Sequence, residues 1–283
     1  MKLVTYLGAE SPRIGLLHGG AVVDAEEAAG RPLPRDMTAL LAAGIGPLRA
    51  ALDRPLPSGI PVRSARLLAP VPRPGKIIGV GRNYGAHAAE AGLAAQEKPR
   101  LFAKVVSSVI GPGAPIPKPA AVEKLDWEVE LAVVIARPMR DVPAERALDF
   151  VAGYTVLNDV SAREFQFDVS PPQTSFAKSM DGFCPMGPCL VTADEIPDPQ
   201  RLDLRCWVNG VLMQDGNTAD MIFPTPAILA HVSRYMTLEP GDVIATGTPE
   251  GVGAFRKPPV YLRPGDRIRM EIPEIGVLEN TVA

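Results

Sequence analysis

The stretch WEVELAVVIA, residues 127–136, is the clearest β-strand in the chain and decides how the rest is interpreted. Glu128 and Glu130 stand two positions apart in it, so both carboxylates lie on one face, close enough for a single hard cation to bind an oxygen from each. An ordinary solvent-facing strand edge is the alternative interpretation. The opposite face is predicted to be apolar, because hydrophobic residues recur at every second position: Trp127, Val129, Leu131, Val133 and Ile135.

The next strand, VAGYTVLND at residues 151–159, is apolar through Leu157 and then ends in Asn158 and Asp159. A third carboxylate at a strand end is well placed to join Glu128 and Glu130. Three carboxylates in a small space repel one another, which raises their pKa values unless a divalent cation offsets the charge. An all-oxygen set without an obvious histidine or cysteine partner favours Mg²⁺, Mn²⁺ or Ca²⁺ over zinc.

Among the three histidines, His87 is the candidate for chemistry. If residues 83–92 form a helix, His87 and Glu90 share a face at a spacing of three, where a carboxylate orients an imidazole and stabilises its protonated form. A surface His–Glu pair is the alternative interpretation. His18 adjoins a turn and His231 lies in an amphipathic helix, so we expect surface or packing roles for both.

The residues before this core predict a small α+β unit with a hairpin at Gly19-Gly20 and a helix that Asp36 caps. The helix carries apolar residues at near-helical spacing from Met37 to Leu48, although Gly44 and Gly46 weaken its continuity. Six prolines between residues 55 and 74 are typical of a connector. We therefore expect a small N-terminal domain over residues 1–70 and a catalytic domain over residues 71–283.

Later segments alternate short strands with few helices. Residues 76–81 and 243–245 are predicted to be strands, Asn209-Gly210 a hairpin turn, and the pair 267–272 and 276–282 a closing hairpin. Thr225 is predicted to cap a helix with Pro226 in its first position. The glycine-rich stretch TGTPEGVG, residues 246–253, can bring backbone amides and the hydroxyl of Thr248 close to a ligand, but it lacks the phosphate-loop pattern.

Composition narrows the class of protein. The chain has 283 residues with 29 Lys and Arg against 32 Asp and Glu, a net charge of −3, which argues against nucleic-acid binding. Its apolar runs are shorter than a membrane span requires. Three cysteines without a CxxC pair favour a reducing, cytoplasmic location. The 31 prolines and 26 glycines indicate many turns and a strand-rich α+β fold rather than a long helical bundle.

Six segments in order resemble the fumarylacetoacetate hydrolase superfamily. They span about residue 76 to the end of the chain: GVGRNYGAHAAEAG (79–92), LDWEVELAVVI (125–135), GYTVLNDVSAREFQ (153–166), FAKSMDGFCPMGP (176–188), NGVLMQDGNTADMIF (209–223) and PGDVIATGTPEGVG (240–253). The first 70 residues are similar to the small N-terminal domain of many bacterial members. The resemblance implies a mixed β-sandwich or roll-like catalytic fold and a homodimer.

The resemblance also implies roles for individual residues. Mg²⁺ or Mn²⁺ would be held by Glu128, Glu130 and Asp159, and His87 with Glu90 would form a water-activating dyad on a lid segment. The positions that contact the substrate's carboxylate and keto oxygens would be Lys178, Arg163, Gln166 and Thr248. Lys178 would in addition stabilise an enolate or donate a proton.

Two departures from the family pattern matter. The tyrosine-degrading enzyme that names the family has an additional aspartate ligand, whereas Gly81-Arg82-Asn83 offers no carboxylate at that place. The chain is therefore more similar to the branch of bacterial acylpyruvases and sugar-acid hydrolases. The stretch 168–176, just before Lys178, matches no pattern that can be assigned.

The sequence thus predicts hydrolysis of a carbon–carbon bond in a small 2,4-dioxo acid, which releases pyruvate and a second acid. Oxaloacetate decarboxylation, or a keto–enol or double-bond isomerisation, is the alternative, since both also pass through an enolate and need no attacking water. A non-catalytic module that binds divalent cations or keto acids is a third interpretation. Neither a nucleic acid nor a membrane is expected as a partner.

Overall fold

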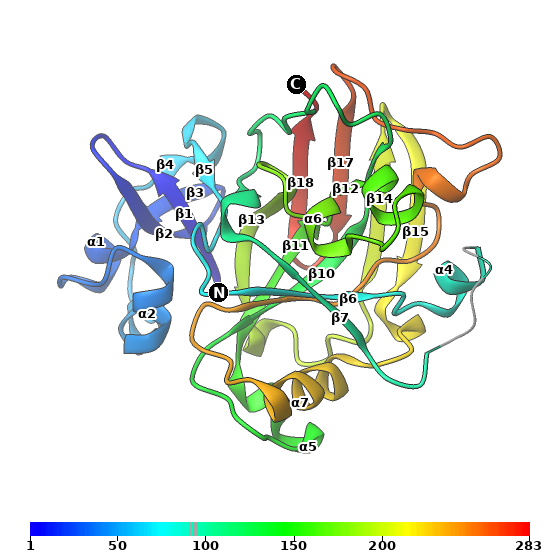
Figure 1. The fold of residues 1–283 in the computed structure, drawn as a ribbon. Helices are drawn as coiled ribbons and strands as arrows, with labels where there is room; N and C mark the ends of the chain where they lie inside the picture. The colour runs from blue at the N-terminus through cyan, green and yellow to red at the C-terminus, as the bar shows by residue number, and fades with distance from the viewer. Residues whose placement is uncertain (91, 93–95) are drawn as a thin grey trace.

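The computed structural model describes residues 1–90, 92 and 96–283, and it is strand-rich with short helices, as predicted. One large mixed sheet forms the frame (Figure 1). Its main path runs β4 (Ile60–Pro61), β3 (Ala21–Asp24), β2 (Pro12–His18), β1 (Lys2–Leu7), β13 (Cys184–Thr192), β11 (Val151–Asn158), β10 (Val129–Ile135), β16 (Val243–Ala245), β6 (Ile77–Gly81) and β7 (Arg100–Lys104). Two short strands pair with this path, β5 (Leu67–Leu68) with β1 and β8 (Val109–Ile110) with β13.

A second sheet packs against the first. Its strands are, in order, β15 (Val211–Asn217), β14 (Asp203–Val208), β17 (Arg267–Ile272) and β18 (Gly276–Thr281), and a two-stranded ladder joins β9 (Leu125–Asp126) to β12 (Ser161–Ala162). The predicted hairpin turn at Asn209-Gly210 and the predicted closing hairpin are confirmed, since β14 pairs with β15 and β17 with β18. Asn209 and Gly210 both have positive φ, as their tight turn requires.

The helices are short and lie around the sheets. Apart from 3₁₀ turns and a π-helical turn at Glu164–Asp168, they are α1 (Ala25–Ala29), α2 (Met37–Ala43), α3 (Gly46–Ala51), α4 (Gly85–Glu90), α5 (Ala144–Ala147), α6 (Thr174–Ala177) and α7 (Thr225–Tyr235). α5 and α7 lie side by side at the bottom of Figure 1. In the described part of the chain, no helix combines the length and the apolar character needed to cross a membrane.

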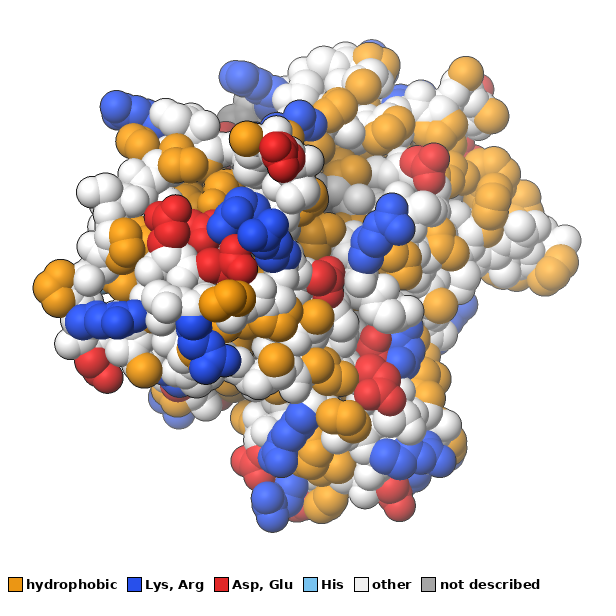
Figure 2. All heavy atoms as spheres, turned by 90° about the vertical axis from the view of Figure 1, so that its left-hand side faces the viewer, with side chains coloured by type: hydrophobic (Ala, Val, Ile, Leu, Met, Phe, Trp, Pro, Cys, Tyr) orange, Lys and Arg blue, Asp and Glu red, His pale blue; other side chains and the backbone are white. Residues whose placement is uncertain are grey.

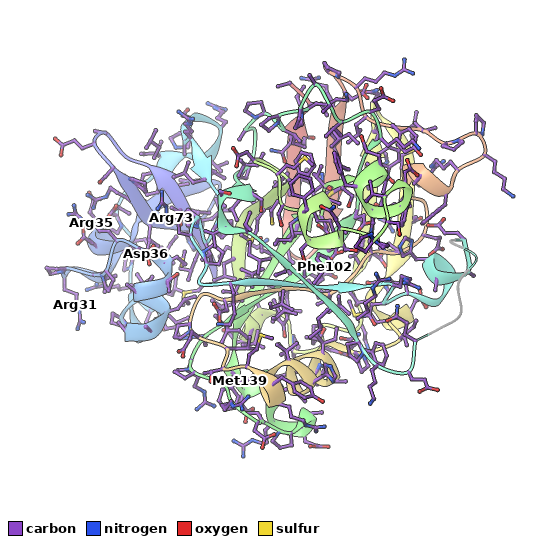
Figure 3. The ribbon with its side chains drawn as sticks, viewed as in Figure 1. Arg31, Arg35, Asp36, Arg73, Phe102 and Met139 are labelled. Carbon is purple, nitrogen blue, oxygen red and sulfur yellow. The ribbon has the colours of Figure 1, made fainter. Side chains whose placement is uncertain are left out.

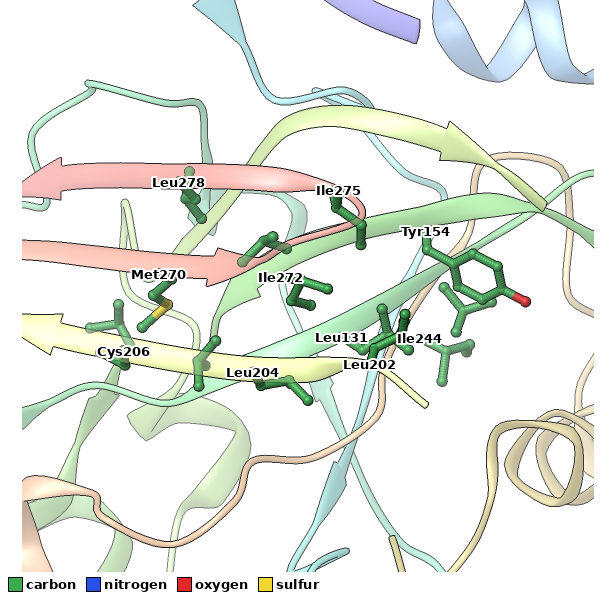
Figure 4. Packing of buried hydrophobic residues seen from close by; sticks show 14 of the residues in the cluster. Leu131, Tyr154, Leu202, Leu204, Cys206, Ile244, Met270, Ile272, Ile275 and Leu278 are labelled. Atoms are coloured by element: carbon green, nitrogen blue, oxygen red, sulfur yellow. The ribbon is translucent and has the colours of Figure 1, made fainter. Parts of the chain in front are cut away.

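Both faces of β10 are buried, each against its own core. Leu131 and Val133 belong to a cluster shared with the second sheet, and Figure 4 shows Leu204 and Ile272 of that sheet on the side of Leu131. The other face contributes Val134 to a second cluster, which contains side chains of β1, β2 and α2. The interpretation of this strand as a solvent-facing edge is therefore wrong, because the sheet is covered on both sides.

The N-terminal elements gather at one side of the molecule, on the left in Figure 1, and join the main sheet. Leu3 of β1 pairs with Leu190 of β13, and the proline-rich segment supplies β4 and β5 rather than acting only as a connector. On this face acidic, basic and apolar side chains are interspersed (Figure 2). The division into domains at residue 70 stays a prediction, but both parts share one sheet and one core cluster.

Two local predictions need correction. The helix over residues 37–48 is two helices, because Gly44 adopts φ 86° and ends α2, whose first turn Asp36 caps as expected. Thr225 is not a capping side chain: it is the first residue of α7 after Pro224, and its amide donates to the Gln200 side chain at 2.8 Å. A side chain from 25 residues earlier does the capping, which no local pattern reveals.

Helix α4 occupies part of the predicted segment 83–92. It begins at Gly85, and the amide of Gly92, at φ 69°, donates to the Ala89 carbonyl at 2.9 Å. Residue 91 lies outside the described residues. Asn83, just before the helix, is fully buried, and its side chain bonds the backbone of Phe223 and Thr246. The start of α4 is therefore tied to the glycine-rich loop.

Candidate metal centre and active site

The register of β10 against β11 brings three carboxylates together. Val129 lies opposite Asn158, and the Asp159 amide donates to the Glu128 carbonyl at 2.9 Å, so Asp159 and Glu128 face each other at the strand ends. Opposite residues share a face, as do residues two apart, which adds Glu130. Potential ligand atoms of the three all lie within 4.8 Å of one another, and all three side chains are buried. Their role as metal ligands stays a prediction.

Basic side chains surround part of this triad. Lys178 donates to Glu128 at 2.8 Å and also to Asp159, and Arg163 donates to Glu128 at 2.7 Å. Burial alone would raise the pKa of Glu128, but the charges of Lys178 and Arg163 outweigh it and hold that pKa below its usual range. Asp159 and Glu128 in turn raise the pKa of Lys178 against the effect of burial, so Lys178 is a cation at neutral pH.

Glu130 is the exception within the triad. Among the described residues, only the Gly247 amide donates a hydrogen bond to it, at 2.8 Å. Burial, followed by the charges of Asp159 and Glu128, raises the pKa of Glu130 well above its usual range. A buried carboxylate with one donor and two like charges nearby fits a divalent cation, which would offset that repulsion.

The glycine-rich loop holds the site's carboxylates through its amides. Besides Gly247 on Glu130, the amide of Gly251 donates to Glu90 at 3.1 Å and that of Gly253 to Asp126 at 2.7 Å. Gly251 has φ 99°, and a Cβ there would lie 2.1 Å from the Met213 carbonyl, so only glycine fits. The loop therefore does present backbone amides to the site, as predicted, but they bind carboxylate side chains of the protein.

His87 and Glu90 form the predicted pair on α4. Nδ1 of His87 lies 2.9 Å from Oε1 of Glu90, and His87 is 6% exposed. Glu90 also accepts from the Gly251 amide, so it is held as an acceptor. With Nδ1 donating to this carboxylate, Nε2 is left with its lone pair. The geometry suits a general base.

A cavity of about 270 Å³ lies over the triad. Every predicted site residue except Asp159 and Glu90 lines it, and those two contact the lining residues Lys178 and His87. The predicted residues in its wall are His87, Glu128, Glu130, Arg163, Gln166, Lys178 and Thr248.

Two predicted substrate contacts, Arg163 and Thr248, differ in whether the described residues leave them an unpaired hydrogen-bond donor. Arg163 is 2% exposed and donates to Asp126, Glu128 and Gln166, but its Nη2 has no hydrogen-bond partner among the described residues. The Thr248 hydroxyl instead donates to the Val129 carbonyl at 2.9 Å and accepts from a side-chain amide. Arg163 therefore keeps one donor that no described residue pairs, although Nη2 itself is buried, whereas the proton of Thr248 is already used.

Comparisons with known proteins identify the family. The family model "Fumarylacetoacetate (FAA) hydrolase C-terminal" matches residues 76–283. The chain belongs to the fumarylacetoacetate hydrolase family. It is 44% identical over 289 aligned residues to an oxaloacetate tautomerase of Xenopus laevis, named as mitochondrial, and the alignment covers 100% of this chain and 90% of the relative.

Solved structures from this fumarylacetoacetate hydrolase family share the whole fold. A maleylpyruvate hydrolase of a Sphingobium species, solved in complex with manganese(II) and pyruvate, has a TM-score of 0.83 at 35% identity and covers 100% of this chain and 99% of its own. A 5-carboxymethyl-2-hydroxymuconate delta-isomerase of Mycobacterium smegmatis has a TM-score of 0.79 at 36% identity, with 100% and 98% covered. Relatives thus carry hydrolase, isomerase and tautomerase names.

Sequence reasoning missed two charged residues beside the candidate triad. Lys104, 3% exposed, donates to Asp159 at 2.6 Å and to the Phe183 carbonyl. Asp126, fully buried, accepts from Arg163 at 2.8 Å. Asp126 continues the alternation of Glu128 and Glu130 by two positions, which was a usable signal, whereas Lys104 only ends an apolar strand.

The unassigned stretch 168–176 forms part of the cavity wall. Pro172 and Thr174 line the cavity beside Phe167 of the π-helical turn. Phe167 packs against Phe255, with ring centroids 5.8 Å apart. Figure 3 shows Phe102 on β7, where that strand passes α6, and Phe102 also lines the cavity. One wall is therefore aromatic and apolar.

Proposed function

We propose that this chain is a divalent-metal-dependent enzyme that interconverts the keto and enol forms of a small 2-oxo acid, with oxaloacetate as the first candidate substrate. One observation carries the proposal: Glu128 and Glu130 of the buried triad line one cavity with the cation Lys178 and with Arg163, and Asp159, the third member, lies behind them in contact with Lys178. A cation held by the carboxylates, together with Lys178 and Arg163, would match the carboxylate and keto oxygens of a 2-oxo acid.

The head of the substrate would bind between the triad and the two cations. Mg²⁺ or Mn²⁺ held by Glu128, Glu130 and Asp159 would supply Lewis-acid stabilisation of negative charge on the substrate's oxygens. Asp126 and Glu128 fix the guanidinium of Arg163 in the cavity wall, and its buried Nη2 would donate to the substrate carboxylate once the side chains that cover it move aside. The ammonium of Lys178 adds a fixed positive charge near the developing enolate.

Proton transfer falls to His87. Its Nε2 would take the proton from the carbon next to the keto group, breaking that C–H bond and leaving the electron pair in the enolate. Glu90, 2.9 Å from Nδ1, orients the ring and stabilises the imidazolium that results. Return of the proton to the enolate oxygen gives the enol, and the reverse sequence gives the ketone. Lys178, a cation, does not serve as the base.

The names of relatives bring both reactions into consideration, and several full-length relatives support the tautomerase. Relatives that align over the full chain at 42–44% identity are named oxaloacetate tautomerases. A relative of Burkholderia multivorans that is 47% identical over 98% of this chain is named "Putative hydrolase". Solved structures named as hydrolases or isomerases match at 32–39% identity. The manganese(II) and pyruvate in one of those structures support Mg²⁺ or Mn²⁺ as the cofactor here.

Hydrolysis of a 2,4-dioxo acid, the reaction expected from the sequence, is the second candidate. The His87–Glu90 pair favours it, because the same Nε2 can deprotonate a water that attacks the distal carbonyl. The C–C bond would then break, its electrons would form the enolate of pyruvate, and the second fragment would leave as a carboxylic acid.

Freshly dissolved enol oxaloacetate separates the candidates. We expect the purified protein with Mg²⁺ or Mn²⁺ to speed the loss of the enol's ultraviolet absorbance over the buffer rate, without release of CO₂ or pyruvate. Rapid CO₂ release would identify a decarboxylase, and equimolar pyruvate and acetate from acetylpyruvate a hydrolase. Undiminished turnover after chelation with EDTA would reject the metal role, and turnover of none of these compounds would leave a binding module.

Two variants test the base. His87→Ala should remove most of the acceleration, whereas His231→Ala, whose ring lies outside the cavity, should leave it unchanged.

A homodimer and a cytoplasmic location remain our proposals from the family resemblance and the cysteine content. Light scattering of the purified protein tests the first, and fractionation of the source cells the second.

A further inference from the structure

The charges of the site define what the far end of the substrate can be. With Glu130 ionised, as a metal ligand must be, four buried carboxylates (Glu128, Glu130, Asp159 and Asp126) face three buried cations (Lys178, Lys104 and Arg163), which leaves one excess negative charge. A divalent cation would turn this into one excess positive charge, and the substrate's first carboxylate would cancel it. A second carboxylate would therefore need further cations.

Two further cations line the same cavity. Arg82 follows the end of β6, and Arg100 begins β7 directly opposite Gly81 in the antiparallel register. The two arginines therefore come from neighbouring strand ends. They lie on the β6 and β7 side of the cavity, whereas the triad comes from β10 and β11.

The backbone at Arg82 adopts a conformation that is unusual for an arginine. Its φ is 58°, the left-handed region that favours glycine and asparagine over arginine. The conformation is imposed from both sides. Asn83 is anchored by its bonds to Phe223 and Thr246, and Gly247 packs so closely that a Cβ there would lie 2.7 Å from Cβ of Asn83. Strain of this kind persists only where the surrounding structure fixes the backbone, and it clusters at functional sites.

We infer that Arg82 and Arg100 form a second anion subsite, which takes the distal carboxylate of a 2-oxo dicarboxylic acid. The inference rests on the proposed function, since the first carboxylate is assigned to the metal and Arg163. The cavity of about 270 Å³ leaves room for a substrate longer than oxaloacetate, so the subsite selects for the second charge rather than for one chain length.

Binding of matched ligands to the Mn²⁺-loaded protein tests the subsite without turnover. Isothermal titration calorimetry would compare 2-oxoglutarate with 2-oxovalerate, and 2-oxoadipate with 2-oxohexanoate, since each pair differs mainly in the distal carboxylate. We expect the dicarboxylate to bind at least roughly tenfold more tightly, as a charge-assisted hydrogen bond provides. Equal or weaker binding of the dicarboxylates would overturn the inference and assign the distal end to the aromatic wall.

Variants assign the preference to the two arginines. Arg82→Asn keeps a residue that tolerates positive φ, and with Arg100→Gln it should abolish the preference for dicarboxylates. Arg31→Gln changes an exposed arginine of the N-terminal region (Figure 3) and should leave the preference intact. A preference that survives in the double variant would overturn the assignment.

Oxalate, which has only the head of the substrate, separates the two possible failures. It should bind the wild type and the double variant equally, which also shows that the variant is folded. If oxalate does not bind the Mn²⁺-loaded wild type, the proposed function fails. If oxalate binds but the dicarboxylates gain nothing over their partners, only the second subsite fails.

Discussion

Asp24 in the N-terminal region and Glu130 in the cavity are both buried carboxylates, at 8% and 1% exposure, yet their pKa values shift in opposite directions. Asp24 accepts from the Tyr6 hydroxyl at 2.8 Å and from Arg13 at 2.6 Å, and its other oxygen caps α1. Burial alone would raise its pKa, but these bonds outweigh it and lower the pKa. Glu130 has one amide donor and two like charges.

The difference shows that burial alone does not indicate what a carboxylate does. Asp24 has donors for both oxygens, so it stabilises the fold as it stands. Glu130 lacks donors and is repelled by Asp159 and Glu128, so it is matched to a cation that the chain itself does not supply. The ratio of donors to like charges separates a structural carboxylate from one prepared for a ligand.

The largest expected effect follows from Glu130→Gln. This nearly isosteric change removes one oxygen ligand and its charge, and several kcal/mol of Lewis-acid stabilisation correspond to a roughly thousandfold fall in kcat/KM. Because a repulsion is also removed, the melting temperature of the metal-free protein should stay level or rise. A variant with near wild-type kcat/KM, or one that unfolds readily, would place Glu130 in the same class as Asp24.

Asp24→Ala should show the reverse pattern. The loss of a helix cap and of two charge-assisted bonds should lower the free energy of unfolding by about 3 kcal/mol in urea, with kcat unchanged per folded molecule. Asp36→Ala is the matched control, since that exposed residue makes one capping bond to α2 and should cost about 1 kcal/mol. Equal losses of unfolding free energy in the two variants would show that the Tyr6 and Arg13 bonds to Asp24 add nothing to its capping bond.

The two carboxylates should also give opposite pH dependence in metal-free protein. The folded pKa of Asp24 is lowered, so its stabilisation is present above the unfolded pKa and is lost as pH falls through the folded pKa. The folded pKa of Glu130 is raised, so its contribution is fully present below the unfolded pKa and is lost as pH rises through the folded pKa. The free energy of unfolding, measured in urea at several pH values, should fall less steeply toward acid pH in Asp24→Ala than in the wild type. In Glu130→Gln it should fall less steeply as pH rises. Variants whose free energy depends on pH as in the wild type would count against both assignments.

The smallest effect concerns Thr248, which lines the cavity like Glu130 but has its hydroxyl bonded as fully as Asp24. Thr248→Val should lower the free energy of unfolding by about 1 kcal/mol, because the Val129 carbonyl loses its donor. Thr248→Ser, which keeps the hydroxyl, should restore the loss. A larger change in KM than in stability would show instead that the hydroxyl contacts the substrate.

Local periodicity explains what the sequence could predict. Glu128 and Glu130 share a face because strands alternate every residue, and Asp159 ends the next strand along the chain, so their meeting follows from two adjacent segments. His87 and Glu90 meet for the same kind of reason, within one helical turn.

Contacts between distant segments could not be predicted in this way. Lys104 meets Asp159 across 55 residues, and the Gln200 side chain meets the Thr225 amide because two loops pack together. The covering of the second face of β10 likewise depends on the N-terminal strands joining its sheet. Such contacts arise from tertiary packing, which leaves no period in the sequence.

Electron paramagnetic resonance of Mn²⁺ tests the central claim most directly. Titration of the wild type should show one tightly bound Mn²⁺ per chain, lost in Glu128→Gln, Glu130→Gln and Asp159→Asn but retained in Asp24→Asn. Oxalate added to the wild-type complex should change the spectrum of the bound ion. No bound Mn²⁺ in the wild type, or one bound Mn²⁺ that persists in all three site variants, would contradict a shared cation at the ends of β10 and β11.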